Sequence, residues 1–280
     1  MQFKEVSPAD APKNRASRQE GFAVALARSA FKKLAPLSVQ NQIKEIFRQA
    51  MMPTDSPTKS ELLFRVLAEL RVFELYQPLP WIGFRGGTRA EDTEKRWGAI
   101  KQELEAFEMA GTAMDLGAQL GYFSFKLAER GWLSLAVEAD PGTYQASVLA
   151  RDAIGLDRIT NQKMLIDSSS VHNLPRVDVT IFLSLWHHIV HAEGFASGKK
   201  VLTEVLNRTN DVCFFETGQS TESGNRELEW RKSLPSMEPS PEKWISELLI
   251  DCGAKDVKVL GKFGTPHLNG VKRTLFAAFM

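Results

Sequence analysis

Two glycines four positions apart separate an apolar run from a helical one in the stretch DLGAQLG, residues 115–121. Glycine at 117 and 121 lets the backbone of such a turn approach a ligand closely, because no Cβ is in the way. The helix that follows offers free N–H groups and a positive dipole end. Glu138 ends the next apolar run, where a carboxylate can accept hydrogen bonds from both hydroxyls of a ribose. These residues predict a site for a nucleoside-containing cofactor.

A second group of residues able to do chemistry lies in LSLWHHIVH, residues 183–191. Histidine titrates near neutral pH, so His187 or His188 could act as a general base that removes a proton from a substrate hydroxyl. The same histidines could instead be hydrogen-bonded residues that only line a pocket. His187 and His191 have the spacing of two metal ligands on a helix, but without an evident third ligand we expect no metal.

The elements that must position these residues appear after residue 110, where short apolar runs alternate with helical stretches. Five runs are of the fully buried kind found in parallel sheets: 112–117, 134–139, 158–165, 177–184 and 212–218. Helical stretches at 122–130, 141–153 and 194–208 lie between them. A helix at 241–253 precedes two further strands, 255–263 and 273–280, joined as an antiparallel pair. The pattern predicts an α/β fold with a seven-stranded, mostly parallel sheet and an antiparallel last strand.

Every periodic segment within residues 1–110 has helical spacing, so we expect a helical N-terminal region before a second domain at 111–280. Ser56 and Thr88 stand at N-cap positions of two of its helices. The Pro- and Gly-rich segment 77–88 between these helices carries two aromatic residues and Arg85. It is typical of a lid or a substrate-facing loop.

The glycine turn does not fit the common nucleotide-binding motifs, because neither G-x-G-x-x-G nor G-x-x-x-x-G-K-[ST] occurs there. DLGAQLG instead resembles the first motif, D-x-G-x-G-x-G, of the class I, Rossmann-like S-adenosylmethionine-dependent methyltransferases, with Gln119 in place of the middle glycine. The resemblance covers residues 110–280 and includes the seven-stranded layout. It implies S-adenosyl-L-methionine as the cofactor and methyl transfer as the reaction.

The resemblance also implies roles for individual residues. Asp115 would orient the turn and reach the methionine amino group, Tyr122 would flank the cofactor, and Glu138 would hold the ribose. Asp167 and Ser168 would meet the adenine edge, although Asp167 is equally well explained as a helix N-cap. The full set of expected cofactor-binding residues is Asp115, Gly117, Ala118, Gly121, Tyr122, Glu138, Asp167, Ser168 and Ser184.

Four further residues near these motifs have two possible roles. Glu216 opens a long polar segment at the end of the fifth strand, beside the expected cleft. Arg96 and Trp97 could face the methionine carboxylate, although core packing explains Trp97 better. Trp186 could form a wall of the substrate pocket or belong to the core.

Composition limits the partners. The chain of 280 residues has a net charge of +1, which argues against a general coat for nucleic acid. Residues 1–50 carry nine Lys and Arg against four Asp and Glu, so a basic face is possible there. Cys213 and Cys252 form neither a disulfide framework nor a metal cluster, which favours a cytoplasmic location. No apolar run approaches the ~20 residues that span a bilayer, so we expect no membrane partner.

Three functions remain open. The first is a methyltransferase acting on a hydroxyl, an amine or a carbon of a small polar or natural-product substrate. The second is an RNA-modifying transferase, because the layout is also similar to that of the tRNA wobble-uridine carboxymethyl transferase. The third is a cofactor-binding scaffold that has lost catalysis, since Gln119 replaces a glycine. The acceptor and the oligomeric state are not readable from the residues.

Overall fold

The computed structural model describes residues 59–280, apart from 86, 88–89, 223–227 and 266–270. The predicted strands are all present: β1 Thr112–Leu116, β2 Leu133–Glu138, β3 Ile159–Lys163, β4 Val177–Leu183, β5 Thr209–Glu216, β6 Asp256–Gly264 and β7 Lys272–Phe279. The helices are α3 Lys59–Glu69, α4 Ala90–Leu104, α5 Tyr122–Glu129, α6 Pro141–Ile154, α7 Trp186–Glu193, α8 Phe195–Asn207 and α9 Pro241–Asp251. Short 3₁₀ turns are η1 Pro80–Ile82, η2 Val171–Asn173 and η3 Glu229–Ser233.

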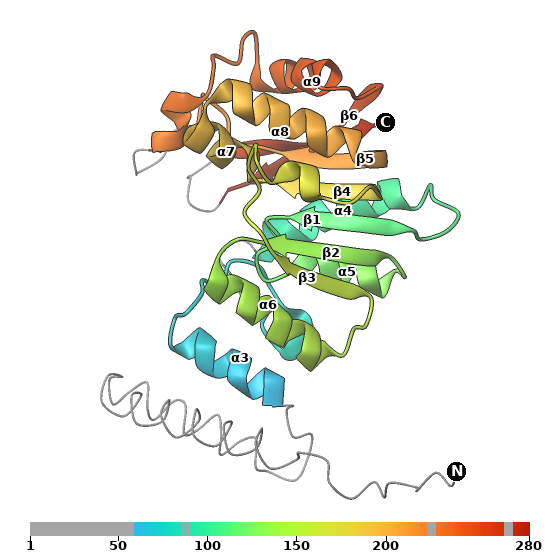
Figure 1. Ribbon diagram of the computed structural model, residues 1–280, viewed down its shortest axis with the longest axis vertical. Helices are drawn as coiled ribbons and strands as arrows, with labels where there is room; N and C mark the ends of the chain where they lie inside the picture. Colours follow the sequence, from blue (N-terminus) through green and yellow to red (C-terminus); the bar gives the residue numbers. More distant parts are fainter. Residues whose placement is uncertain (1–58, 86, 88–89, 223–227, 266–270) are drawn as a thin grey trace, which may run out of the picture. The chain divides into compact units, whose positions relative to one another are not determined.

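The seven strands form one sheet in the order β3-β2-β1-β4-β5-β7-β6 (Figure 1). β1 to β5 pair in parallel, whereas β7 runs antiparallel to both β5 and β6. The α/β class, the strand number and the single antiparallel last strand are therefore confirmed. The strand order reverses between β1 and β4, and ligands of open parallel sheets bind at such a reversal, outside the carboxyl ends of the strands.

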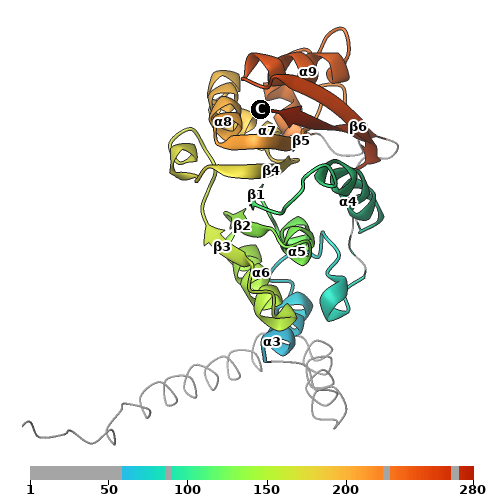
Figure 2. The same cartoon turned by 90° about the vertical axis from the view of Figure 1, so that its right-hand side faces the viewer.

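Apolar side chains alternate between the two faces of the sheet because successive residues of a strand point in opposite directions. On β5, Phe214 packs with α4 and α5, whereas Phe215 packs with α7, α8 and α9. Figure 2 shows the sheet edge-on, with α4 and α5 on one side and α7 and α8 on the other. A third apolar cluster joins α3, α5 and α6 beside β2 and β3. The core thus holds both helical layers against the sheet.

The described part of the helical N-terminal region packs into the same compact unit as the sheet, residues 57–280. In α3 the buried residue is Phe64, whereas Leu63, which the helical period places on the expected packing face, is exposed. Leu79 and Ile82, inside the segment expected to be a lid or loop, are buried in the cluster with Phe64. The basic segment 1–50 and the caps at Ser56 and Thr88 lie outside the described residues.

None of the helices in the described ranges has the length and apolar character that crossing a lipid bilayer requires.

Candidate functional site

The turn between β1 and α5 has the backbone shape that the glycine pattern predicts. Gly117 and Gly121 have φ angles of 69° and 93°, and Gln119 between them has φ 54°. All three lie in the left-handed region, which costs an L-residue such as glutamine roughly 1–2 kcal/mol. The Gln119 side chain offsets this cost, because its Nε2 donates to the Glu74 carbonyl and its Oε1 accepts the Leu120 N–H. Glutamine therefore keeps the turn that a glycine would form.

Glu138, at the carboxyl end of β2, holds this turn. Its Oε2 accepts the Gln119 N–H over 2.9 Å, and its Oε1 accepts the N–H groups of Ala139 and Asp140, both over 2.9 Å. A carboxylate has about four lone-pair positions, so a ribose hydroxyl can still bind there. Asp140 in turn caps α6 by accepting the Thr143 N–H.

A cavity of about 550 Å³ opens at the carboxyl ends of the parallel strands. One wall is the turn and β2 end, with Gly117, Gln119, Val137, Glu138 and Ala139. The residues after β3, Met164 to Asp167, form a second wall. The β4 end and α7 add Leu183, Ser184, Leu185, His188 and Ile189, and the segment before β1 adds Tyr76, Gln77, Thr93 and Arg96. Apolar surface with a few convergent polar groups is typical of a ligand pocket.

Asp167 faces this cavity from a turn that its own side chain organises. Its Oδ1 accepts the Ser169 hydroxyl and the N–H groups of Ser169 and Ser170. The hydroxyl hydrogen bond is the main reason that the pKa of Asp167 lies below its ordinary value. Asp167 therefore organises a turn and lines the cavity, but it is not a helix N-cap, because the next helical element, η2, has Ser170 at its N-cap position.

The two adjacent histidines occupy different environments. His188 is exposed and lines the cavity, whereas His187 is buried behind it. His187 Nδ1 accepts the Gly218 N–H over 3.0 Å and contacts the Thr217 hydroxyl at 3.3 Å. The two histidines therefore differ in access to a ligand, because of the two only His188 lines the cavity. His191, which has the spacing of a second metal ligand relative to His187, contacts the Ser233 hydroxyl. Within the described ranges no three His, Cys, Asp or Glu side chains are grouped as metal ligands.

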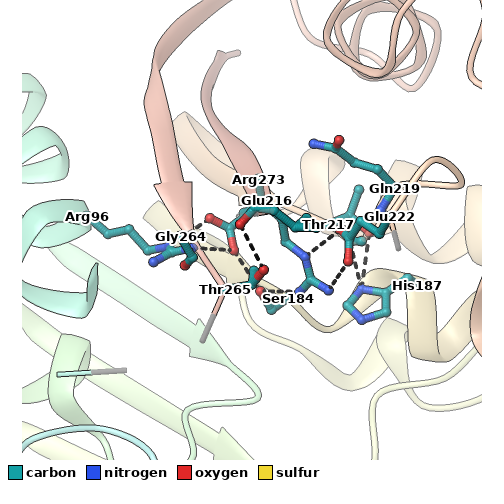
Figure 3. A network of polar contacts seen from close by, with 12 residues as sticks. Arg96, Ser184, His187, Glu216, Thr217, Gln219, Glu222, Gly264, Thr265 and Arg273 are labelled. Carbon is teal, nitrogen blue, oxygen red and sulfur yellow. Dashed lines mark hydrogen bonds and ion pairs between the residues drawn. The ribbon is translucent and has the colours of Figure 1, made fainter. Parts of the chain in front are cut away.

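A chain of buried charges closes the cavity on the β5 side (Figure 3). Arg96 from α4 donates to both carboxylate oxygens of Glu216, over 2.7 and 3.2 Å. Ser184, with φ 56°, donates to Glu216 Oε1 over 2.7 Å and accepts from Arg273 Nη1 over 3.0 Å. Arg273 completes the chain with a two-bond ion pair to Glu222. Burial alone would lower the pKa of Arg273, but the hydrogen bonds and charges of Glu222 and Glu216 raise it.

Six of the sequence-predicted site residues do not reach the cavity, although they lie close to it. Asp115 is buried, and burial raises its pKa to about 7, even though the Ser124 hydroxyl donates to it over 2.9 Å. Tyr122 is buried against Trp81 and Phe123, so it packs in the core instead of flanking the ligand space. The other four that do not line the cavity are Ala118, Gly121, Ser168 and His187. Gly117, Glu138, Asp167, Ser184 and His188 do line it.

Of the residues with two possible roles, Arg96 and Glu216 line the cavity, whereas Trp97 and Trp186 belong to the core. Sequence reasoning missed Tyr76 and Thr93, which come from segments before β1, whereas Gln77 belongs to the segment 77–88 that was expected to face the substrate. It also missed Arg273, for which a signal existed: an arginine at the start of the apolar strand RTLFAAFM. Glu222, in a polar segment, carried no such signal.

This protein resembles known proteins in its three-dimensional structure, whereas the sequence comparisons found no match. No protein-family model matches the chain, and no curated protein matches it. Among solved structures, WbdD superposes with a TM-score of 0.62 at 20% identity, over 77% of this chain and 46% of the WbdD chain. Another structure of that protein, described as the bifunctional kinase-methyltransferase WbdD, gives 0.59 at 19% identity, over 77% of this chain and 45% of that chain. This chain therefore spans less than half the length of WbdD.

The N-terminal domain of EvdMO1, solved in the presence of SAH and D-fucose, superposes with a TM-score of 0.54 at 16% identity. This match covers 80% of this chain and 97% of the EvdMO1 domain. The chain thus has the fold of the class I, Rossmann-like S-adenosylmethionine-dependent methyltransferases.

Proposed function

We propose that this protein is an S-adenosylmethionine-dependent methyltransferase that acts on a hydroxyl group of a small polar molecule. One observation carries the proposal. Glu138 ends β2 beside the left-handed Gly117 turn, and both line a cavity at the carboxyl ends of the parallel strands. In open parallel sheets this is the place where a nucleoside ligand binds, with an acidic residue on its ribose.

The cavity fits a positively charged nucleoside cofactor. Five carboxylate side chains line it, from Glu74, Glu138, Asp167, Glu193 and Glu216, against one guanidinium. Such a cavity attracts cations, and S-adenosylmethionine carries a sulfonium. At Gly117 an added Cβ would lie 3.1 Å from Leu185 Cδ2, so the close approach of turn and β4 end depends on glycine. The residues present therefore suit this cofactor in shape and in charge.

Residues of this chain have distinct tasks in the proposal. Glu138 accepts a ribose hydroxyl, and Met164 to Asp167 meet the adenine. The turn at Gly117 lets the backbone approach the ligand. When bound, the cofactor supplies an electrophilic methyl group. The chain must then place an acceptor atom in line with that group and exclude water.

His188 is the residue we propose as general base. It lines the cavity at the start of α7, next to the β4 end, and imidazole takes up a proton near neutral pH. His187 is a poorer candidate, because its Nδ1 already accepts the Gly218 N–H and the ring is buried. If the acceptor is an amine or a carbon, positioning supplies most of the acceleration and His188 is a pocket wall.

The acceptor is proposed to be a small molecule in preference to RNA. Carboxylates on the cavity wall repel nucleic-acid phosphates, and the binding of such phosphates depends on Lys and Arg contacts. Tyr76, Gln77 and Thr93, from the helical N-terminal region, add neutral hydrogen-bonding groups suited to hydroxyls. The EvdMO1 domain, whose structure was determined with SAH and D-fucose, supports a hydroxylated acceptor.

The proposal is tested with cofactor carrying a tritiated methyl group, incubated with the protein and either the small-molecule fraction or the RNA fraction of a cell extract. We expect label in the small-molecule fraction, and none with the Gly117→Val variant. Label in RNA alone would favour the RNA-modifying alternative. SAH binding without transfer to either fraction would favour a scaffold that has lost catalysis.

A further inference from the structure

The ion pair between Arg273 and Glu222 is buried and does not line the cavity. Arg273 Nε and Nη2 donate to the two carboxylate oxygens of Glu222, over 2.8 and 2.9 Å. The two side chains are 4% and 0% exposed. Desolvation of buried charges costs several kcal/mol per ion, so such a pair is weak evidence for stability alone. The residues that contact Glu222 and Arg273 indicate a second role for the ion pair.

On the Glu222 side the pair fixes the polar segment that follows β5. Glu222 Oε1 accepts the Gln219 N–H over 2.9 Å, and the Glu222 N–H donates to the Gln219 carbonyl over 3.1 Å. Together these bonds close a turn over residues 219–222. Gly218, immediately before this turn, donates its N–H to His187 Nδ1 over 3.0 Å. The ion pair therefore holds the residues that present this N–H group to the imidazole.

On the Arg273 side the pair reaches the cavity floor. Arg273 Nη1 donates to the Ser184 hydroxyl over 3.0 Å, and Ser184 lines the cavity in a left-handed conformation. The Trp230 ring packs over the Arg273 guanidinium, with 5.5 Å between Cζ and the ring centroid. The same ring lies 4.4 Å from the His187 ring, measured between centroids. Arg273 is thus connected to His187 by two routes, through Glu222 and through Trp230.

The hydrogen bond from Gly218 favours one tautomer of the neutral His187 ring. A nitrogen that accepts an N–H carries no proton, so the proton of the neutral ring is on Nε2. The His187 and His188 ring centroids are 4.1 Å apart, and His188 lines the cavity. The orientation of the proposed base therefore depends on a neighbour whose own position depends on the segment after β5.

We infer that Arg273 and Glu222 are positioning residues, which hold the Gly218 N–H against His187 and so fix the tautomer of His187 and the orientation of His188. The effect on methyl transfer rests on the proposed function, whereas the effect on the His187 tautomer does not. The two parts can be measured separately.

The tautomer is measured on protein labelled with ¹⁵N-histidine, by long-range ¹H–¹⁵N spectra. In the wild type we expect His187 as a single Nε2–H tautomer. In Glu222→Gln and Arg273→Met we expect a mixture of tautomers, because the Gly218 N–H is no longer held. Glu103→Gln is the matched control, since it breaks an ion pair of 2.8 Å to Lys258 away from the cavity. It should leave the His187 signals unchanged.

A single substitution leaves one buried charge without its partner, and the variant can fail to fold for that reason. The double variant Glu222→Leu with Arg273→Met removes both charges and is the second test, because such replacements are often neutral or stabilising. We expect it to fold and to show the tautomer mixture. A folded double variant that keeps the single Nε2–H form would overturn the inference.

The effect of Arg273 and Glu222 on methyl transfer is measured as the turnover number of the variants. Misplacement of a catalytic group by about 1 Å can cost about 10²-fold, so we expect a loss of this size in turnover with SAH affinity retained. Turnover equal to wild type in a variant with mixed tautomers would overturn the catalytic part. If the wild type does not bind SAH, the proposed function fails, and the tautomer result still decides the structural part.

Discussion

The backbone N–H of Gln119 donates a hydrogen bond of 2.9 Å to the carboxylate of Glu138, so the end of β2 holds the turn that follows β1. The residue at the middle position of the glycine motif is therefore attached to the proposed ribose-binding residue. A change in either one should affect the other. Because the bond uses the backbone N–H, a residue other than glycine at position 119 is still held to Glu138.

Replacement of Gln119 separates backbone strain from side-chain bonds. Gln119→Gly relieves the left-handed strain of roughly 1–2 kcal/mol but loses both side-chain hydrogen bonds, each worth about 1 kcal/mol. Gln119→Ala loses the bonds and keeps the strain. We therefore expect the glycine variant to unfold at a higher temperature than the alanine variant, and close to wild type. Equal melting temperatures for the two variants would contradict the strain argument.

Asp115 should make stability depend on pH. Its folded pKa of about 7 lies above the ordinary 3.8, so the folded state binds the proton more tightly than the unfolded state. Its contribution is complete below about 3.8 and is lost as pH rises through about 7. Asp115→Asn stays neutral and should not lose this contribution. The difference in unfolding free energy between the variant and the wild type should therefore grow, in favour of the variant, by about 2–4 kcal/mol as the pH rises from 4 to 8.

Asp178→Asn is the control, because the pKa of Asp178 is lowered whereas that of Asp115 is raised. The N–H of Thr112 is the main cause of the lowered pKa of Asp178, so that carboxylate stabilises the fold above its ordinary pKa. Its loss should lower stability at neutral pH and matter little in acid. Urea unfolding at several pH values measures both variants. Parallel stability curves for wild type and Asp115→Asn would show that Asp115 does not titrate as described.

The two histidines should respond differently to alanine. His188→Ala should lower turnover by roughly 10²- to 10⁴-fold and leave SAH affinity nearly unchanged, because a positioned base is worth that much. The wild-type rate should rise with pH through about 6 to 7, and the variant should lack this rise. His187→Ala should lower turnover only through the orientation of His188, and it should in addition cost about 1–3 kcal/mol of stability, since it leaves the buried Gly218 N–H unpaired. Full turnover with an unchanged pH profile in His188→Ala would remove the base assignment.

Gly218 should not tolerate a side chain. An added Cβ would lie 2.5 Å from the Trp230 ring and 3.0 Å from His187 Cγ, so Gly218→Ala must displace one of them. We expect lower thermal stability and a changed Trp230 fluorescence. Gly98→Ala is the control, because, apart from adjacent residues and the backbone of α4 itself, no atom lies within 4 Å of its added Cβ. It should stabilise the protein by roughly 0.5–1 kcal/mol. Similar effects for both would contradict the described contact.

The sequence predicts the sheet well because buried parallel strands are short apolar runs separated by helices, and each such run here became a strand. It predicts Gly117, Glu138, Ser184 and His188 on the cavity wall because strand ends of a parallel sheet meet at one edge. It does not separate them from close neighbours such as Tyr122. Tyr122 begins α5, where neighbouring side chains differ by about 100° around the helix axis, so Phe123 lines the cavity while Tyr122 packs in the core.

The buried ion pairs are beyond sequence reasoning for another reason. Arg96 and Glu216 lie 120 positions apart, and Arg273 and Glu222 lie 51 apart. No local period connects them. These charges meet only because β5 pairs with β7 and α4 packs on the same strands. That arrangement is a property of the complete fold.

The central claim is that the cavity binds the nucleoside cofactor, and calorimetry with SAH tests it most directly. The wild type should bind one SAH per chain. Glu138→Ala should weaken binding by about 2 kcal/mol or more, because ribose hydrogen bonds to a carboxylate are lost. Gly117→Val should abolish binding, because a β-branched residue does not tolerate the left-handed φ and its Cβ would lie 3.1 Å from Leu185 Cδ2. No heat of binding with the wild type, or wild-type affinity in both variants, would contradict the account.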